Sequence, residues 1–224
     1  MNGTGPPHAP DGIVFDCDGL LLDTETSWTR AEETLFARYG RVFTPTHKRR
    51  MLGTAGQVTQ GILEELLDQP GRGLELAGEL IALAWDEVAR GARPQPGAAR
   101  LVGELRGRVP IAVASNSPHG MVDVALEASG LSGVFDLVVG VDDVERPKPA
   151  PDLYEAACRG LGVTPDRAVA LEDSPTGVAS ARSAGLWVIG VPSMDGVELP
   201  ADQLAGSLED LAVWATLGLD GARP

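Results

Sequence analysis

GIVFDCDG, residues 12–19, is the stretch that decides the fold. The apolar run Ile13–Phe15 is short and stops at an acid, which is typical of a strand buried on both faces of a parallel sheet. Asp16 and Asp18 follow it, and Gly19 permits a sharp turn directly afterwards. Ligands of open parallel sheets bind beyond the carboxyl ends of the strands, so this stretch predicts a site built around two carboxylates.

Later segments repeat the pattern of a short apolar run that ends in polar residues or glycine. The further predicted strands are residues 110–115, 136–141, 168–173 and 187–191. Helical spacing occupies the intervals between and before them, at residues 97–108, 118–129, 151–161 and 175–184. Alternation of strands and helices predicts an α/β fold with a Rossmann-like parallel sheet, covered on both faces through right-handed connections.

The interval between the first two predicted strands breaks this alternation. Its apolar residues recur at helical spacing without any strand-like run, so we expect a small all-helical insertion over residues 24–95. The sheet unit then comprises residues 12–23 and 96–218, and the Pro- and Gly-rich residues 1–11 form a disordered tail. Pro94-Gln95-Pro96-Gly97 provides a stiff return linker.

Composition excludes several classes of function. The 224 residues include 18 Lys and Arg against 32 Asp and Glu, a formal net charge of −14, so a nucleic-acid partner is not expected. No apolar stretch approaches the ~20 residues of a membrane span, and the first residues lack a signal-peptide pattern, so we expect a cytoplasmic protein without a membrane partner. The 2 cysteines and 3 histidines show no metal-ligand spacing. Any metal site must therefore consist of carboxylates.

Chemically active residues also follow the other predicted strands. Ser115 and Asn116 stand just before a helix start, where a hydroxyl and free N–H groups can hold an anion. Glu172 and Asp173 end the fourth strand. Lys148, one of only two lysines in the chain, lies between two prolines, which indicates a need for a compact positive charge.

These strand ends place several carboxylates near one another. Two like charges 4 Å apart repel by ~4 kcal/mol at an effective dielectric constant of 20, so a bound cation is expected. Oxygen ligands without His or Cys favour Mg²⁺ over Zn²⁺. Carboxylates, Mg²⁺, a lysine and amide donors together are typical of phosphoryl transfer.

Four segments carry a family resemblance over about residues 11–216. FDCDGLLLDTE (15–25), AVASNSP (112–118), RPKPAPDLY (146–154) and ALEDSPTGVASARSAG (170–185) resemble the motifs of the haloacid-dehalogenase-like hydrolases. The similarity is to the branch of phosphatases and β-phosphoglucomutases, which have a helical cap inserted after the first motif. The resemblance implies that Asp16 is the nucleophile, that Asp18 is the general acid and then the base, and that Lys148 offsets negative charge.

The resemblance also implies the ligands of the cofactor and of the substrate phosphate. Mg²⁺ would be bound by Asp16, the backbone carbonyl of Asp18, and Asp173, with Glu172 either a ligand or a partner of the ligands. The phosphoryl oxygens would be held by residues of the second motif together with the lysine: Ser115, Asn116 and Lys148.

Two departures from the resembled mutases narrow the reaction. Trp28 stands where those mutases have a histidine, and Gly56 stands where they have an arginine that grips a second phosphate. Water is therefore the expected acceptor. Trp28, Gly53 and Thr54 of the cap are candidate substrate contacts.

The sequence thus predicts a Mg²⁺-dependent phosphatase that hydrolyses a small phosphomonoester, such as a sugar phosphate, through an aspartyl-phosphate. The partner is a small phosphorylated metabolite, and the protein is a monomer or homodimer. A β-phosphoglucomutase-like phosphosugar mutase is the alternative enzyme. A phospho-receiver or binding module without turnover is the alternative from another class.

Overall fold

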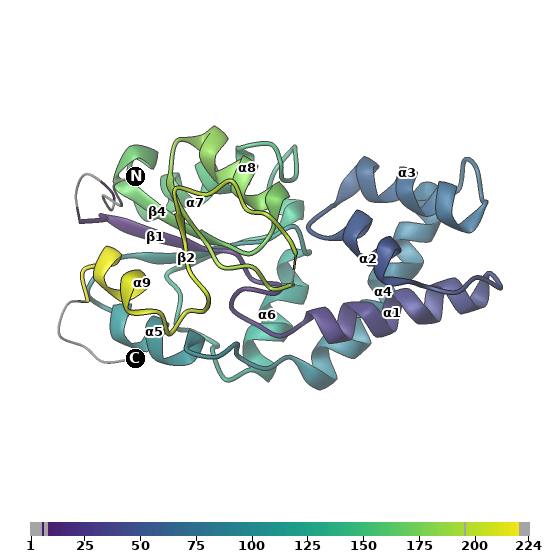
Figure 1. Cartoon of the computed structure of the whole chain (residues 1–224), viewed down its shortest axis with the longest axis horizontal. Helices are drawn as coiled ribbons and strands as arrows, with labels where there is room; N and C mark the ends of the chain where they lie inside the picture. The colour runs from purple at the N-terminus through teal and green to yellow at the C-terminus, as the bar shows by residue number, and fades with distance from the viewer. Residues whose placement is uncertain (1–5, 7–8, 195, 220–224) are drawn as a thin grey trace.

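The protein consists of a sheet unit and a helical unit, side by side (Figure 1). The computed structural model describes residues 6, 9–194 and 196–219. Most of the predicted tail, residues 1–5, 7 and 8, lies outside this range. Asp11, the last residue of that predicted tail, is instead held by the sheet unit. Its N–H donates to the carbonyl of Arg167 at 2.8 Å, and the Arg167 guanidinium donates to its carboxylate at 2.9 Å.

A six-stranded parallel sheet in the order β3-β2-β1-β4-β5-β6 confirms the predicted α/β fold. The strands are β1 (Gly12–Phe15), β2 (Ile111–Ala114), β3 (Leu137–Val139), β4 (Ala168–Glu172), β5 (Trp187–Gly190) and β6 (Gln203–Leu204). β1 lies between β2 and β4, with Val14 opposite both Ala112 and Ala170. The edge strand β6 was not predicted, because two residues without an apolar run give no periodic signal.

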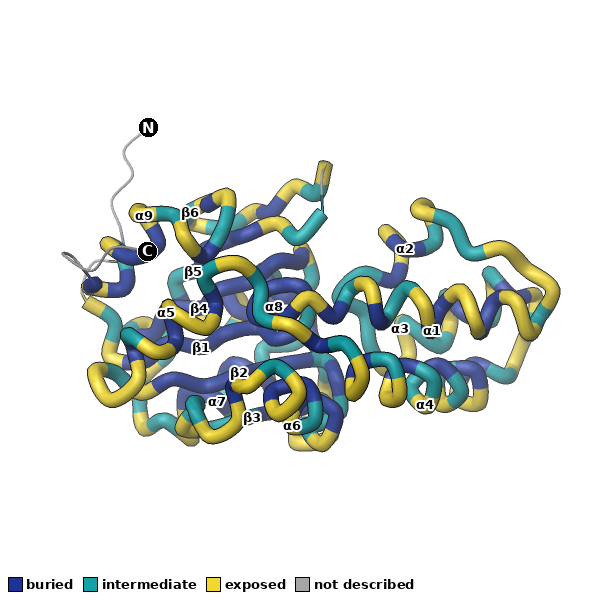
Figure 2. The backbone as a smooth tube through the Cα atoms, turned by 90° about the horizontal axis from the view of Figure 1, so that it is seen from below, coloured by how far each residue is buried: buried dark blue, intermediate teal, exposed yellow. Residues whose placement is uncertain are grey.

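Successive residues of the central strand face opposite sides of the sheet, as strand geometry requires. Ile13 and Phe15 belong to one apolar cluster, whereas Val14 belongs to another. The first cluster includes residues of α5 (Ala98–Leu105), α6 (His119–Ala128) and α9 (Leu211–Thr216). The second includes residues of α7 (Asp152–Leu161) and α8 (Pro175–Ala184). Helices therefore cover both faces, and the strands β1, β2 and β4 are buried along their length (Figure 2).

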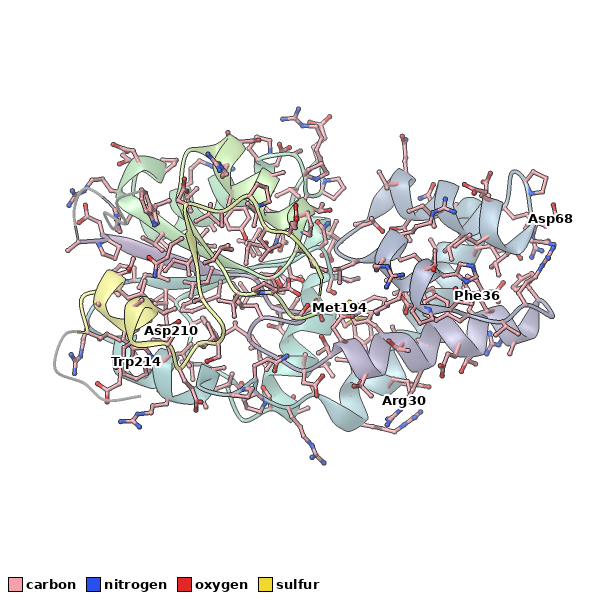
Figure 3. All side chains as sticks on the ribbon, viewed as in Figure 1. Arg30, Phe36, Asp68, Met194, Asp210 and Trp214 are labelled. Atoms are coloured by element: carbon pink, nitrogen blue, oxygen red, sulfur yellow. The ribbon has the colours of Figure 1, made fainter. Side chains whose placement is uncertain are left out.

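The helices between β1 and α5 form the helical unit, called the cap below. Its helices are α1 (Glu25–Arg38), α2 (Pro45–Met51), α3 (Gly56–Leu67) and α4 (Gly73–Gly91). Phe36 is buried inside the cap, and its ring packs edge-on against Phe43 at 4.9 Å. Figure 3 shows Asp68 at the outer tip of the cap, and Asp210 and Trp214 at the opposite end of the molecule.

Short 3-10 helices lie at η1 (Val141–Asp143) and η2 (Pro165–Arg167). None of the described helices combines the length and the apolar character needed to cross a membrane.

The two connections between the units run side by side. The N–H of Asp23 donates to the carbonyl of Arg93 at 2.7 Å, and the N–H of Gln95 donates to the carbonyl of Leu21 at 2.8 Å. The side chain of Gln95 also donates to the carbonyl of Gly19 at 3.0 Å. The outgoing and return segments thus hold each other at the boundary between cap and sheet.

Helix α8 approaches the end of β4 so closely that only glycine fits at residue 177. A Cβ atom there would overlap the carboxylate of Glu172, whereas a Cβ at Gly103 in α5 would meet no atom within 4 Å. We expect Gly177→Ala to destabilise the protein by about 1–3 kcal/mol, because the added methyl group must displace a buried acid. Urea unfolding measures this change.

Gly103→Ala is the matched control for that prediction. It replaces a glycine of a helix by the better helix former without a clash, so we expect stabilisation of about 0.5–1 kcal/mol. Similar effects of the two substitutions on the free energy of unfolding would show that α8 does not depend on this close approach.

Candidate active site

The carboxyl ends of β1, β2 and β4 meet beneath the cap, and a cavity of about 280 Å³ opens there. Most residues that the sequence singled out line this cavity. Those in the sheet unit are Asp16, Asp18, Ser115, Asn116, Lys148 and Asp173, and those in the cap are Trp28, Gly53 and Thr54. Glu172 is fully buried behind the cavity wall, with 0% of its surface exposed.

Lys148 joins two of the acids. Its Nζ lies 2.6 Å from Oδ1 of Asp16 and 2.5 Å from Oε1 of Glu172, and the peptide bond between Lys148 and Pro149 is cis. Burial lowers the pKa of Lys148, but the attraction of the two carboxylates outweighs burial, so the pKa of Lys148 lies above its ordinary value. The ammonium group therefore stays charged at the base of the cavity.

Glu172 is held by hydrogen bonds to both of its oxygens. Oε1 accepts from the hydroxyl of Tyr154 at 2.6 Å as well as from Lys148. Oε2 accepts from the N–H groups of Asp173 at 3.2 Å and Ser174 at 3.4 Å. This arrangement orients Glu172 as the counter-ion of Lys148 and leaves Asp16 and Asp173 as the acids with oxygens less engaged.

The donor set fits a hard cation. One oxygen each from Asp16, Glu172 and Asp173 lies within 4.8 Å of the others. Burial raises the pKa of Asp16 to about 8, against the lowering effect of Lys148 and with the added repulsion of Glu172 and Asp18. Burial, followed by repulsion from Asp16 and Glu172, also raises the pKa of Asp173 well above its ordinary value. A divalent ion with oxygen ligands would compensate the negative charge of these buried acids, because the positive charge around them is too small.

Asp18 receives hydrogen bonds from both units. Its Oδ2 accepts from the hydroxyls of Ser115 at 3.1 Å and Ser117 at 2.7 Å, both in the sheet unit. Its Oδ1 accepts from the hydroxyl of Thr24 at 2.7 Å and from the indole N–H of Trp28 at 3.2 Å. Trp28, predicted as a substrate contact, thus also touches the predicted acid. Ser115, predicted to hold phosphate, here donates to Asp18.

Asn116 fastens the cap to the loop of Lys148. Its Nδ2 donates to the carbonyl of Gly53 at 2.9 Å and to the carbonyl of Lys148 at 3.3 Å, while its Oδ1 accepts from the N–H of Lys148 at 2.9 Å. Gly53 has a φ of +68° and packs close to Ser174: a Cβ atom added at residue 53 would lie 2.8 Å from the hydroxyl oxygen of Ser174. The cap loop therefore rests directly on the sheet unit.

Several contacts of the site were missed in the sequence. Tyr154, which lies within one of the quoted motifs, donates to Glu172, and Ser193 donates to Asp173 at 2.6 Å. Thr24 and Ser117 also stand inside quoted motifs, but nothing in their spacing shows that they reach Asp18. Ser193 follows β5, and its place after a strand end was the only available signal.

Comparisons with known proteins agree with this geometry. A family model of the haloacid dehalogenase-like hydrolases matches residues 10–185. Validoxylamine A 7'-phosphate phosphatase of Streptomyces hygroscopicus subsp. limoneus is 30% identical, over 92% of this chain and 97% of that protein. Fructose-1-phosphate phosphatase YqaB of Escherichia coli (strain K12) is 30% identical, over 80% of this chain and 95% of that protein.

A solved structure shares the whole architecture. It is a variant of CbbY from Rhodobacter sphaeroides in complex with xylulose-(1,5)bisphosphate, with a TM-score of 0.80 and 30% sequence identity. The similarity covers 93% of this chain and 99% of that one. The family model spans well over half of the sequence, and the relatives match along most of their own length. The chain with these clustered strand-end acids is therefore a member of the haloacid dehalogenase-like hydrolases.

Proposed function

We propose that the protein is a Mg²⁺-dependent phosphatase that hydrolyses a small phosphomonoester through an aspartyl-phosphate on Asp16. The observation behind this proposal is the contact of 2.6 Å between Lys148 Nζ and Oδ1 of Asp16 at the base of a cavity that the cap covers. The lysine holds one oxygen of the carboxylate, so the other is the one that attacks phosphorus. The names of the two relatives reported above support phosphomonoester hydrolysis as the class of reaction.

In the first proposed step, an oxygen of Asp16 forms a bond to phosphorus while the bond from phosphorus to the substrate's alcohol oxygen breaks. Asp18 gives its proton to the departing alcohol. In the second step, Asp18 takes a proton from water, the water oxygen bonds to phosphorus, and the Asp16 carboxylate leaves. Asp18 is suited to both transfers because it lines the cavity, and Thr24, Trp28, Ser115 and Ser117 fix its orientation.

Asp16 and Asp173 would hold Mg²⁺, with the backbone carbonyl of Asp18 as a further proposed ligand. The ion would supply positive charge that offsets the phosphate and the buried acids. We assign Glu172 to the orientation of Lys148, because both of its oxygens already accept hydrogen bonds. Lys148 and the N–H of Asn116 are the proposed phosphate donors, and Ser115 would join them when its hydroxyl turns from Asp18 to the phosphate.

A phosphosugar mutase is less well supported than a phosphatase. The cap lining offers Gly56, which has no side chain to hold a second phosphate, and Trp28 in place of the histidine of the resembled mutases. A receiver module without turnover has no need of a covered cavity of about 280 Å³. Free inorganic phosphate as the product separates the phosphatase from both alternatives.

Asp16→Asn tests the nucleophile. The amide keeps the shape of the carboxylate but cannot form the acyl-phosphate, so we expect the rate of phosphate release from para-nitrophenyl phosphate to fall at least about 1,000-fold. Rapid acid quenching should trap a hydroxylamine-sensitive phosphoryl group on the wild-type protein and none on the variant. More than a few per cent of wild-type turnover, in a variant with normal circular dichroism, would exclude Asp16 as the nucleophile.

Removal of metal tests the cation. Without a divalent ion, Asp16 and Asp173 repel the substrate phosphate, so we expect treatment with EDTA to lower phosphate release to less than about one-hundredth. Addition of excess MgCl₂ should restore the original rate. Turnover that continues unchanged in EDTA after gel filtration would rule out a role for the ion.

A further inference from the structure

The cavity that begins at Asp16 continues into the cap, where its lining includes ionisable residues to which the proposed mechanism gives no role. These are Glu25, Glu32 and Lys48. Their neighbours in the wall are apolar or uncharged and include Met51, Thr54, Thr59, Gln60, Leu80 and Ile81. The whole cavity of about 280 Å³ is slightly smaller than the usual small-molecule site of about 300–1,000 Å³, so it suits a small metabolite.

The positive charge of Lys48 is neutralised by two neighbouring carboxylates. Its Nζ lies 2.8 Å from Oε2 of Glu25 and 3.1 Å from Oε2 of Glu32, and only 10% of its side chain is exposed. Two carboxylates thus face one ammonium group. None of the described residues that line the cavity is an arginine. The cap side of the cavity therefore has no surplus positive charge for a second anionic group of a substrate.

Protonation does not change this conclusion. Burial raises the pKa of Glu32 to about 7, against the opposing attraction of Lys48. Burial lowers the pKa of Lys48, but Glu25 and Glu32 outweigh burial, so the net pKa of Lys48 rises and its ammonium stays charged. The formal charge of the trio is −1 with Glu32 ionised and 0 with Glu32 protonated.

The uncharged polar groups of this wall add hydrogen-bond acceptors. The hydroxyl of Thr54 donates its only proton to the carbonyl of Met51 at 2.9 Å. The contact of 2.9 Å between the hydroxyls of Thr54 and Thr59 must then use the proton of Thr59. Both hydroxyls have spent their protons within the protein, so they offer only lone pairs to a ligand. Together with the Glu25 and Glu32 carboxylates, they make a wall rich in acceptors.

We propose that Glu25, Glu32 and Lys48 form a subsite for an uncharged, hydroxyl-rich alcohol portion of the substrate, and that this subsite excludes alcohols with a second anionic group. The inference rests on the proposed phosphatase function and names its substrate class. Hydroxyl groups donate to the acceptors of the wall, and the carbon skeleton packs on Met51 and Leu80. A carboxylate or second phosphate would be desolvated there beside two acids.

This assignment predicts a substrate different from the ligand of the structural neighbour CbbY, a variant of which was crystallised with xylulose-(1,5)bisphosphate. A bisphosphate needs positive charge at both ends of the cavity. Here Lys148 lies at the sheet end, whereas the lysine at the cap end is neutralised by two glutamates. We therefore expect a bisphosphate to be a poor substrate of this protein.

Matched substrate pairs test the inference with the wild-type protein and Mg²⁺. In the first pair, glycerol 3-phosphate has a hydroxymethyl group where 3-phosphoglycerate has a carboxylate. In the second pair, fructose 1,6-bisphosphate has one phosphate more than fructose 6-phosphate. We expect kcat/KM to favour the less charged member of each pair at least tenfold. Equal values, or a preference for the more charged member, would overturn the proposed subsite.

Charge variants test whether the trio is the cause of the preference. Glu25→Gln combined with Glu32→Gln leaves Lys48 as a free positive charge, so the preference for glycerol 3-phosphate over 3-phosphoglycerate should shrink at least fivefold, mainly through KM. Glu33→Gln removes one negative charge, half the change of the double variant, at an exposed residue of the same helix that does not line the cavity, and its ratio should match the wild type. Equal ratios in all three proteins would place the discrimination elsewhere and overturn the assignment.

Two further readouts keep the outcomes distinct. Hydrolysis of para-nitrophenyl phosphate reports the proposed phosphatase chemistry itself. If the protein does not hydrolyse this compound, the proposed function is refuted. If it does, but the ratio of the paired substrates is inverted, only the subsite is refuted. Glucosamine 6-phosphate compared with glucose 6-phosphate tests for recognition of a cation. Similar kcat/KM values for the two support a subsite for uncharged alcohols, whereas a tenfold preference for the amine would overturn it.

Discussion

Concentration of buried acids around a single lysine is the constraint on which the rest of the structure depends. Asp16, Glu172 and Asp173 end adjacent strands and are almost entirely buried, and Lys148 contacts the first two of them. Uncompensated buried charges cost several kcal/mol each, so the lysine and its orienting partners must be held in place. Tyr154 and the tight approach of α8 at Gly177 both serve to fix Glu172.

The cap is the second half of the same arrangement. Thr24 and Trp28 donate to Asp18 from the cap side, while Ser115 and Ser117 donate to it from the sheet. The acid is thus oriented by four donors only when the two units are together. The cap also contributes the acceptor-rich wall of the same cavity, so it takes part both in orienting Asp18 and in lining the space for a ligand.

Much of the fold could be predicted from the sequence, and so could the meeting of most candidate site residues at one edge of the sheet. Strands such as Ile111–Ala114 are short apolar runs, and the acids and the lysine stand directly after them, so their meeting at one sheet edge follows from topology. Side-chain partnerships could not be derived, because they join distant residues without any periodic pattern. Ser115 and Asp18 are separated by 97 residues, and Lys148 and Asp16 by 132. The pairing of Lys48 with Glu25 and Glu32 was missed for the same reason.

Asn116 binds the backbone of Lys148 on both sides and the carbonyl of Gly53 with one amide group. One side chain thus ties the position of a cap loop to that of the backbone that carries the ammonium group. A substitution at residue 116 would therefore disturb both units at once.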